Sequence, residues 1–174
     1  MRATPDPKRI RAPFRLPGSA LCYLLLLPGI YGQTLSLPPA SAPPGGRVAI
    51  EISFKSKAGN EVSTLQWETT IPAARLNFAD EGVVSGAAAN AAGKSVNCAP
   101  KASANSASKT LACILFGGQQ AIPDGVIALL RLQVLPEAVP GTAQIRIDQA
   151  LAVSKDLKRF PIDAVDGTVT VTGK

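Results

Sequence analysis

Short runs of alternating apolar and polar residues, separated by proline and glycine, fill the sequence beyond residue 33. In one run Val48, Ile50, Ile52 and Phe54 alternate with small or polar residues, a period of two that is typical of a strand with one buried face. No segment of the sequence keeps the apolar period of 3.6 residues that marks an amphipathic helix. The pattern therefore predicts an all-β fold, an antiparallel β-sandwich of about nine strands.

Strands are expected at residues 35–37, 48–55, 62–71, 110–116, 126–135, 143–148, 159–162 and 168–171.

The segment between the third and fourth of these strands differs from them in composition. Residues 85–108 consist mainly of Ala, Ser, Asn, Gly and Lys and hold few large apolar side chains. Such a segment buries little surface, so we expect a long surface loop there, interrupted by a weak strand near residues 95–98.

Length and charge limit the class of protein. The 174 residues allow one domain of ordinary size. Of the formal net charge of +6, most lies in residues 1–32, where five basic side chains stand against one acidic side chain. The remainder of the chain holds 13 basic and 11 acidic residues. No basic stripe is left there to contact phosphates, so we expect no nucleic-acid partner.

Residues 1–32 have the three parts of a secretory signal peptide. A basic region ends at Arg15, the apolar run 20–27 follows, and small residues lead to Gly32. The apolar run is about half of the ~20 residues that a membrane-spanning helix needs. We expect cleavage near Gly32 and a single mature domain, residues 33–174, that is secreted, periplasmic or on the cell surface. The alternative is a retained N-terminal anchor, because an Ala-x-Ala cleavage pattern is missing.

The cysteines follow from this expected location. Cys22 would leave with the signal peptide, so the mature chain would keep Cys98 and Cys113 in an oxidising compartment. We expect a disulfide between them, which would contribute about 3 kcal/mol by restricting the unfolded chain. The alternative is a pair of buried free thiols.

Catalytic residues are scarce. The chain has no histidine, which excludes Ser-His-Asp and Cys-His catalysis and histidine metal sites. Glu51, Glu68, Asp80 and Glu81 are the candidates for a pair of hydrolytic carboxylates. Glu51 and Glu68 point outward on successive expected strands and so could share a sheet face. A solvated face explains these acids better than catalysis, and we expect no enzyme activity.

One acidic turn is a candidate calcium site. Asp163 and Asp166 in the segment DAVDG supply oxygen ligands of the kind that calcium prefers. Two carboxylates are fewer than the six to eight oxygens that this ion usually takes, so a simple turn is the better interpretation. We expect no metal and no cofactor.

The single tryptophan of the chain could be a sugar-stacking platform or a core anchor. Trp67 shares its strand phase with Leu65 and Ile71, and Phe54 shares one with other aliphatic residues. We therefore place these four side chains in the core, together with Leu132 of the long apolar strand at residues 126–135. A planar strip of sugar-binding aromatics is not expected.

The order of these segments resembles the cohesin module of cellulosome scaffold proteins, over roughly residues 35–172. The series comprises the Gly-rich turn and strand GGRVAIEI (45–52), the strand of Leu65, Trp67 and Ile71 leading through Pro72 to Leu76, the strand GVIALLRLQV (125–134), and the closing DGTVTV (166–171). The family patterns for the last two are GVLAxLxFxV and xGTVTV. No single motif is diagnostic, since many sandwiches share each strand pattern, and the resemblance rests on their serial order.

The resemblance implies a jelly-roll β-sandwich of nine strands, related to carbohydrate-binding modules. Cohesins bind the calcium-loaded dockerin modules of other proteins across one sheet face and so attach enzymes to a scaffold. This chain differs from scaffold proteins in having one module, no dockerin of its own, the 85–108 segment and the cysteine pair. The resemblance assigns no binding residue here.

Three functions follow from these observations. The leading hypothesis is a secreted, non-catalytic binding module for a dockerin-type protein partner, in polysaccharide degradation or at the cell surface. The alternative is a carbohydrate-binding module whose partner is a polysaccharide. The second alternative is a structural cell-surface β-sandwich without a specific ligand.

Overall fold

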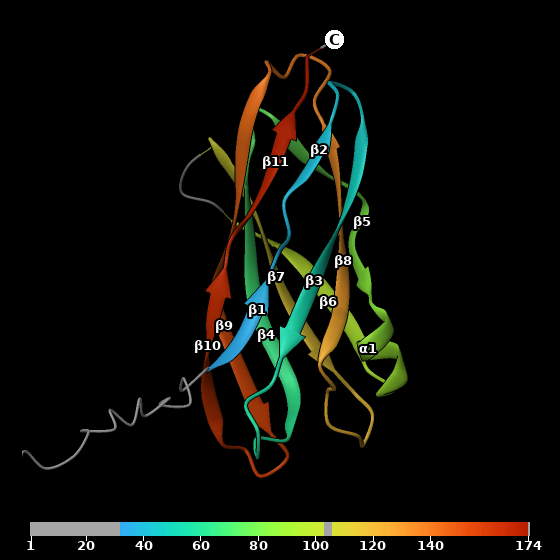
Figure 1. The fold of residues 1–174 in the computed structure, drawn as a ribbon, viewed down its shortest axis with the longest axis vertical. Helices are drawn as coiled ribbons and strands as arrows, with labels where there is room; N and C mark the ends of the chain where they lie inside the picture. The colour runs from blue at the N-terminus through green and yellow to red at the C-terminus, as the bar shows by residue number, and fades with distance from the viewer. Residues whose placement is uncertain (1–31, 103–105, 174) are drawn as a thin grey trace, which may run out of the picture.

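The computed structural model describes residues 32–102 and 106–173, so the expected signal peptide, apart from Gly32, lies outside the described residues. Eleven strands and one short helix make up the described part (Figure 1). They are β1 (Gln33–Ser36), β2 (Ala40–Ala42), β3 (Arg47–Lys55), β4 (Val62–Pro72), β5 (Leu76–Ser85), α1 (Ala87–Ala91), β6 (Ser95–Lys101), β7 (Ser108–Phe116), β8 (Gly125–Val134), β9 (Gly141–Ser154), β10 (Arg159–Val165) and β11 (Gly167–Val171). In this part of the chain, no helix has the length and hydrophobicity needed to cross a membrane.

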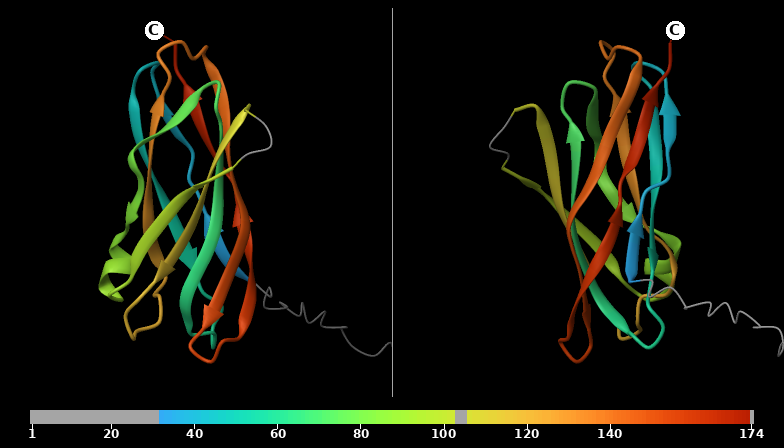
Figure 2. Two further views of the ribbon diagram at one scale, coloured as in Figure 1. Left: turned by 180° about the vertical axis from the view of Figure 1, so that it is seen from behind. Right: turned by 60° about the vertical axis from the view of Figure 1, so that its left-hand side comes forward.

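Nine of the strands form one continuous path that wraps around the core. Its order is β5-β8-β3-β1-β10-β9-β4-β7-β6, and β2 and β11 lie beside it, with β11 paired to β9. The path folds into two opposed layers, β5-β8-β3-β1 and β10-β9-β4-β7-β6, which Figure 2 shows from two further sides. The predicted β-sandwich of about nine strands is therefore confirmed.

The first two strands of the described part pair in parallel with the last two. β1 runs along β10, with Gln33 opposite Ile162, and β2 runs along β11, with Ala40 opposite Val169. The other strand pairs are antiparallel. β1 also pairs with β3, so it connects the two layers.

The inward phases of the strands fill a continuous apolar core. Ile50, Ile52, Leu130, Leu132 and Ile145 are each at most 1% exposed. The side chains assigned to the core from the sequence are all buried, and their exposed fractions are 2% for Phe54, 0% for Leu65, 0% for Trp67, 1% for Ile71 and 0% for Leu132. Alternation along each strand places these residues inside, because neighbouring positions point to opposite faces of a sheet.

The long surface loop expected over residues 85–108 is not what the structure shows. Helix α1 packs on β8 with Ala89 fully buried, and β6 pairs over its whole length with β7. The Cys98–Cys113 disulfide joins these two strands, as the sequence predicted. The prediction of a loop was wrong because small side chains can pack closely, and because backbone hydrogen bonds and the disulfide stabilise β6 without large apolar residues.

Candidate functional site

The two outer surfaces of the sandwich differ in their side chains. Helix α1 packs against β8 and β6 at the side of the sandwich (Figure 1). The outward positions of the β5-β8-β3-β1 layer include Arg47, Ala49, Glu51 and Arg131, which are mostly charged. The opposite layer has no described helix on it. We call its outward side chains the β9-β4-β7-β6 face and consider this face the candidate site.

The register of the strands arranges the face as a regular grid. Three rows run across β6, β7, β4 and β9: Asn97–Ile114–Gln66–Leu151, Ala99–Ala112–Glu68–Asp148 and Lys101–Thr110–Thr70–Arg146. A bulge in β9 between the first two rows contains Gln149, which adopts a positive φ of 52°. Bulges of this kind redirect side chains and are common at functional positions.

Apolar side chains are exposed at one end of this grid. Ile114 is 39% exposed and Phe116 is 44% exposed, both on β7. The neighbouring outward positions of β9 hold the half-buried Leu151 and Val153. An exposed apolar group that is bordered by polar residues is typical of an interaction surface.

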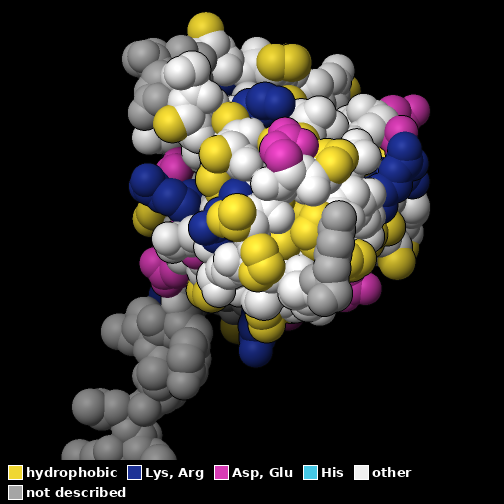
Figure 3. Space-filling view, turned by 90° about the horizontal axis from the view of Figure 1, so that it is seen from above, with side chains coloured by type: hydrophobic (Ala, Val, Ile, Leu, Met, Phe, Trp, Pro, Cys, Tyr) yellow, Lys and Arg dark blue, Asp and Glu magenta, His cyan; other side chains and the backbone are white. Residues whose placement is uncertain are grey.

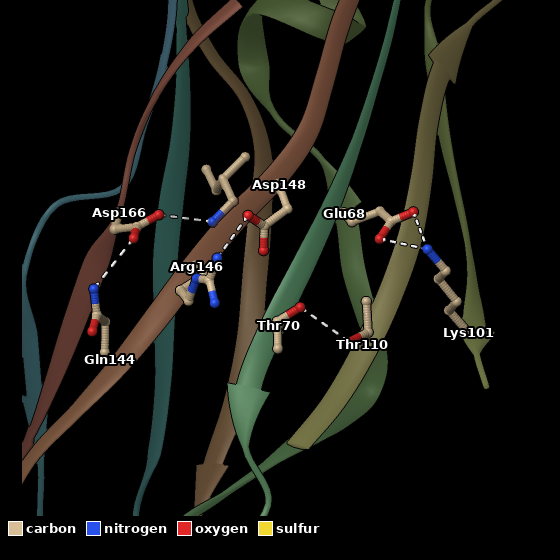
Figure 4. A network of polar contacts seen from close by, with 9 residues as sticks. Glu68, Thr70, Lys101, Thr110, Gln144, Arg146, Asp148 and Asp166 are labelled. Carbon is tan, nitrogen blue, oxygen red and sulfur yellow. Dashed lines mark hydrogen bonds and ion pairs between the residues drawn. The ribbon is translucent and has the colours of Figure 1, made fainter. Parts of the chain in front are cut away.

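Polar contacts hold the other part of the face (Figure 4). The Lys101 ammonium on β6 lies 2.7 and 2.9 Å from the two carboxylate oxygens of Glu68 on β4. This ion pair crosses β7 diagonally, because Glu68 lies opposite the small Ala112 and Lys101 lies opposite Thr110. The Thr70 and Thr110 hydroxyls are 3.0 Å apart. The polar groups of this region are therefore paired with one another and fixed in place.

A second ion pair lies on β9. Arg146 donates to a carboxylate oxygen of Asp148 at 3.1 Å, and both side chains remain more than a third exposed. Such exposed pairs contribute only about 0.2–1 kcal/mol to stability. Their main effect is to fix the positions of charges on the face. On the end of the molecule seen in Figure 3, basic, acidic and apolar side chains are interspersed.

The structure separates the acids that the sequence suggested as a carboxylate pair. Glu51 lies on β3 and Glu68 on β4, in opposite layers, so the expectation that they share a face is wrong. β3 and β4 follow each other in the sequence but lie in opposite layers, so their outward residues point away from each other. Asp80 pairs with Arg47 at 3.3 Å, and Glu81 is exposed on β5.

The acidic turn has a structural role. Asp166 accepts hydrogen bonds from the Ile147 backbone N–H at 2.9 Å and from the Gln144 amide at 3.2 Å. It thereby fixes the start of β11 against β9. In residues 32–102 and 106–173, no group of three or more His, Cys, Asp or Glu residues is arranged to hold a metal ion.

Sequence reasoning missed Ile114 and Phe116 as surface residues. The segment LACILF, residues 111–116, is apolar throughout, so the alternation between the faces is hidden. The signal that could have revealed it is the disulfide. Cys113 must point toward Cys98, and positions one residue and three residues beyond it then point to the other face.

No family model and no curated protein matches the sequence, but solved structures match its fold. The sixth cohesin of scaffoldin B from Acetivibrio cellulolyticus, in complex with a Cel5 dockerin, is 20% identical over 81% of this chain and 99% of that chain, with a TM-score of 0.64. The third cohesin ScaC from the same organism, in complex with the ScaB dockerin, is 14% identical over 81% and 99%, with a TM-score of 0.66.

A non-cellulosomal protein has the same fold. The cohesin from the hyperthermophilic archaeon Archaeoglobus fulgidus is 13% identical over 82% of this chain and 92% of that chain, with a TM-score of 0.58. At these identities the likeness shows the fold. The chain is therefore a cohesin-like jelly-roll β-sandwich, as the resemblance in its sequence implied.

Proposed function

We propose that this chain is a secreted, non-catalytic module that binds a dockerin-type protein partner through the β9-β4-β7-β6 face. The observation that carries this proposal is the exposure of Ile114 and Phe116 on a sheet face that no described helix covers. Burying such side chains against a partner contributes about 25 cal/mol per Å² of apolar surface. A polar border of fixed charges would then select the orientation of the partner.

The type of partner is inferred from the structural neighbours. Two of them were solved as complexes with dockerins, and this chain shares their fold over most of its length. Fold alone does not fix function, so the face itself has to support the assignment. The face supports it in two ways. Four neighbouring strands present one continuous surface. The exposed Ile114 and Phe116 on this surface lie near the Lys101–Glu68 ion pair.

Two alanines on exposed strand positions supply a matched pair of test variants. Ala99 lies on the candidate face on β6, and Ala49 lies on the opposite outer surface on β3. Ala99→Arg adds a long charged side chain within the grid, beside Ala112, whereas Ala49→Arg adds the same side chain far from it. Both positions are exposed, so neither change disturbs the core.

The experiment captures a partner and then measures its affinity. The immobilised protein is exposed to the native secretome, bound proteins are identified by mass spectrometry, and the dockerin-type protein found is purified for calorimetry. We expect Ala99→Arg to weaken binding by about tenfold or more and Ala49→Arg to change it by less than about twofold. Failure to recover a dockerin-type protein, or equal losses for the two variants, would refute the proposal.

The polysaccharide alternative has less support from the structure. Trp67 is buried, and Phe116 is the only exposed aromatic side chain among the described residues 32–102 and 106–173. Sugar-binding faces usually present several aromatic rings. Retention of the protein on insoluble polysaccharides at low micromolar affinity, lost in Phe116→Ala, would favour this alternative over the protein partner.

A further inference from the structure

A groove lies between the two ends of the strand path, where β5 and β6 face each other without forming a ladder. Its volume is about 520 Å³, and we call it the β5–β6 groove. Phe78, Leu111, Cys98 and Pro100 provide apolar lining. The groove opens beside the candidate face, and its lining comes mainly from the inward phase of the strands.

The groove exists because the β6–β7 hairpin bends away from the body of the sandwich (Figure 2). Along β7 the inward side chains become steadily more exposed. The exposed fraction is 0% for Leu115, 2% for Cys113 and 7% for Leu111, and the Lys109 side chain is exposed to solvent. The inner face of the hairpin therefore leaves the core toward its tip and becomes the wall of the groove.

Contacts between β5 and the hairpin close the groove at both ends. At one end the Val96 backbone N–H donates to the Ser85 hydroxyl at 3.0 Å. At the other end Lys109 donates to the Asn77 side-chain oxygen at 3.0 Å. Between these contacts β5 bulges, with four residues, 79–82, opposite a single residue of β8. Three residues of this bulge, Asp80, Glu81 and Gly82, line the groove.

The free edge of β6 directs backbone groups into this groove. The Cα atoms of Cys98 and Cys113 are 4.1 Å apart, which is the short spacing of a pair without mutual backbone hydrogen bonds. Cys98 therefore points its N–H and C=O away from β7, as Val96 does. By the same alternation the Pro100 carbonyl also faces outward, while its nitrogen has no hydrogen to donate.

The walls of the groove carry opposite charges. Asp80 and Glu81 line it on the β5 side, and Lys101 and Lys109 line it on the hairpin side. Asp80 is already paired with Arg47, and Lys101 with Glu68. Glu81 on one wall and Lys109 on the other are therefore the charges that would attract a chain with both basic and acidic side chains. Peptide backbone would complement the edge of β6, and apolar side chains would complement Phe78 and Leu111.

We propose that the β5–β6 groove binds an extended peptide segment of a second protein, which adds to the edge of β6 as a short strand. Strand addition of this kind takes its affinity from main-chain hydrogen bonds and its specificity from alternate side chains. The stretch from Val96 to Lys101 has room for about five residues at ~3.4 Å each. This site is separate from the face of the proposed function, although Lys101 and Thr110 border both.

The probe is the peptide acetyl-Lys-Val-Thr-Val-Glu-amide. Extended, it turns both valines toward the apolar lining and its lysine and glutamate to the opposite face, at the open side of the groove. Titrated at millimolar concentration into the ¹⁵N-labelled full chain, it should shift the amide signals of Gly82, Cys98 and Leu111 and leave that of Ile114 unchanged. A control peptide with both valines N-methylated keeps the side chains but lacks the N–H groups that would bond to β6. Its affinity should therefore be lower by a factor of about ten or more.

Adjacent positions of β6 separate the two proposals. Pro100→Arg places a long side chain in the groove, and Ala99→Arg places it on the candidate face. We expect Pro100→Arg to weaken peptide binding by about tenfold, and Ala99→Arg to leave it within about twofold. Peptide binding unaffected by Pro100→Arg in a variant with a native spectrum, equal binding of the N-methylated peptide, or no shift of groove amides would overturn the proposal.

Discussion

At the scale of single residues, the interior of β4 holds polar atoms without partners. Trp67 Nε1 and Thr69 Oγ1 are buried, and no hydrogen-bond partner is present for either; the same is true of the Gln33 side-chain amide. A buried hydroxyl without a partner costs about 1–3 kcal/mol, because it gives up its hydrogen bonds to water on folding. Trp67 and Thr69 therefore serve packing and shape, and contribute no site.

Thr69→Val tests this cost. Valine has nearly the same shape without the hydroxyl, so we expect the free energy of unfolding to rise by about 1 kcal/mol. Urea unfolding followed by tryptophan fluorescence measures the change. The control is Thr70→Val on the outward phase, where the hydroxyl contacts Thr110 at 3.0 Å and its loss should not stabilise the fold. A decrease in stability for Thr69→Val would contradict the prediction.

Lys94 is a second buried polar residue, with 4% of its surface exposed. Its ammonium donates to the Gly118 carbonyl at 3.2 Å. Gly118 adopts a positive φ of 57°, and a Cβ there would collide with the Ala92 carbonyl, so the two backbone segments approach closely. Burial lowers the pKa of Lys94 from its ordinary value of 10.5.

The lowered pKa of Lys94 predicts a pH dependence of stability. Between the folded pKa and 10.5 the unfolded chain binds more protons, so stability rises with pH in this window. Relative to a Lys94→Met variant, the wild-type protein should therefore gain unfolding free energy between neutral pH and about pH 10. Urea unfolding across this range measures the difference, with Lys57→Met at an exposed lysine as the reference. If the unfolding free energies of the wild type and of Lys94→Met change equally with pH, the prediction is wrong.

At the scale of elements, the β6–β7 hairpin depends on the disulfide more than on apolar burial. The outward phase of β6 is exposed, and its inward residues Val96 and Cys98 are only half-buried. The Cys98–Cys113 bond closes a segment of 15 residues between neighbouring strands. It holds β6 at the edge of the sheet and thereby keeps both the candidate face and the groove in shape.

The double variant Cys98→Ser, Cys113→Ser should lower the free energy of unfolding by about 3 kcal/mol, because the unfolded chain regains the entropy that the closed loop removes. Chemical reduction of the wild-type protein should give a similar loss, which controls for the serine side chains. Equal stability of the oxidised and reduced proteins would show that the hairpin holds without the bond.

The sequence predicted the strands with clear alternation and the pairing of the two cysteines. It did not predict α1 or the full length of β6, because small residues such as Ala89 pack closely without giving an apolar period. It also could not reveal the exposure of Ile114 and Phe116, since a continuously apolar run does not show which phase faces inward. The groove was invisible to it because the bend of a hairpin is a tertiary property.

At the scale of the whole molecule, β1 connects the two layers, since it pairs with β3 on one side and β10 on the other. Leu35 of this strand is 0% exposed. Removal of residues 1–32 should therefore leave the stability of the fold unchanged, whereas removal of residues 1–37 should abolish cooperative unfolding. Thermal unfolding followed by circular dichroism distinguishes them. A cooperative transition in the shorter chain would show that β1 is dispensable.

The parallel pairing of β1 with β10 also limits when the strands can pair during synthesis of the chain. β1 can pair with β3 as soon as β3 has been made, but its other edge has no partner until β10 is synthesised. Contacts between residues so distant in sequence slow folding, since the intervening chain has to be closed into a large loop first. The domain therefore remains open during most of its synthesis, and its layers join only when the C-terminal strands have been made.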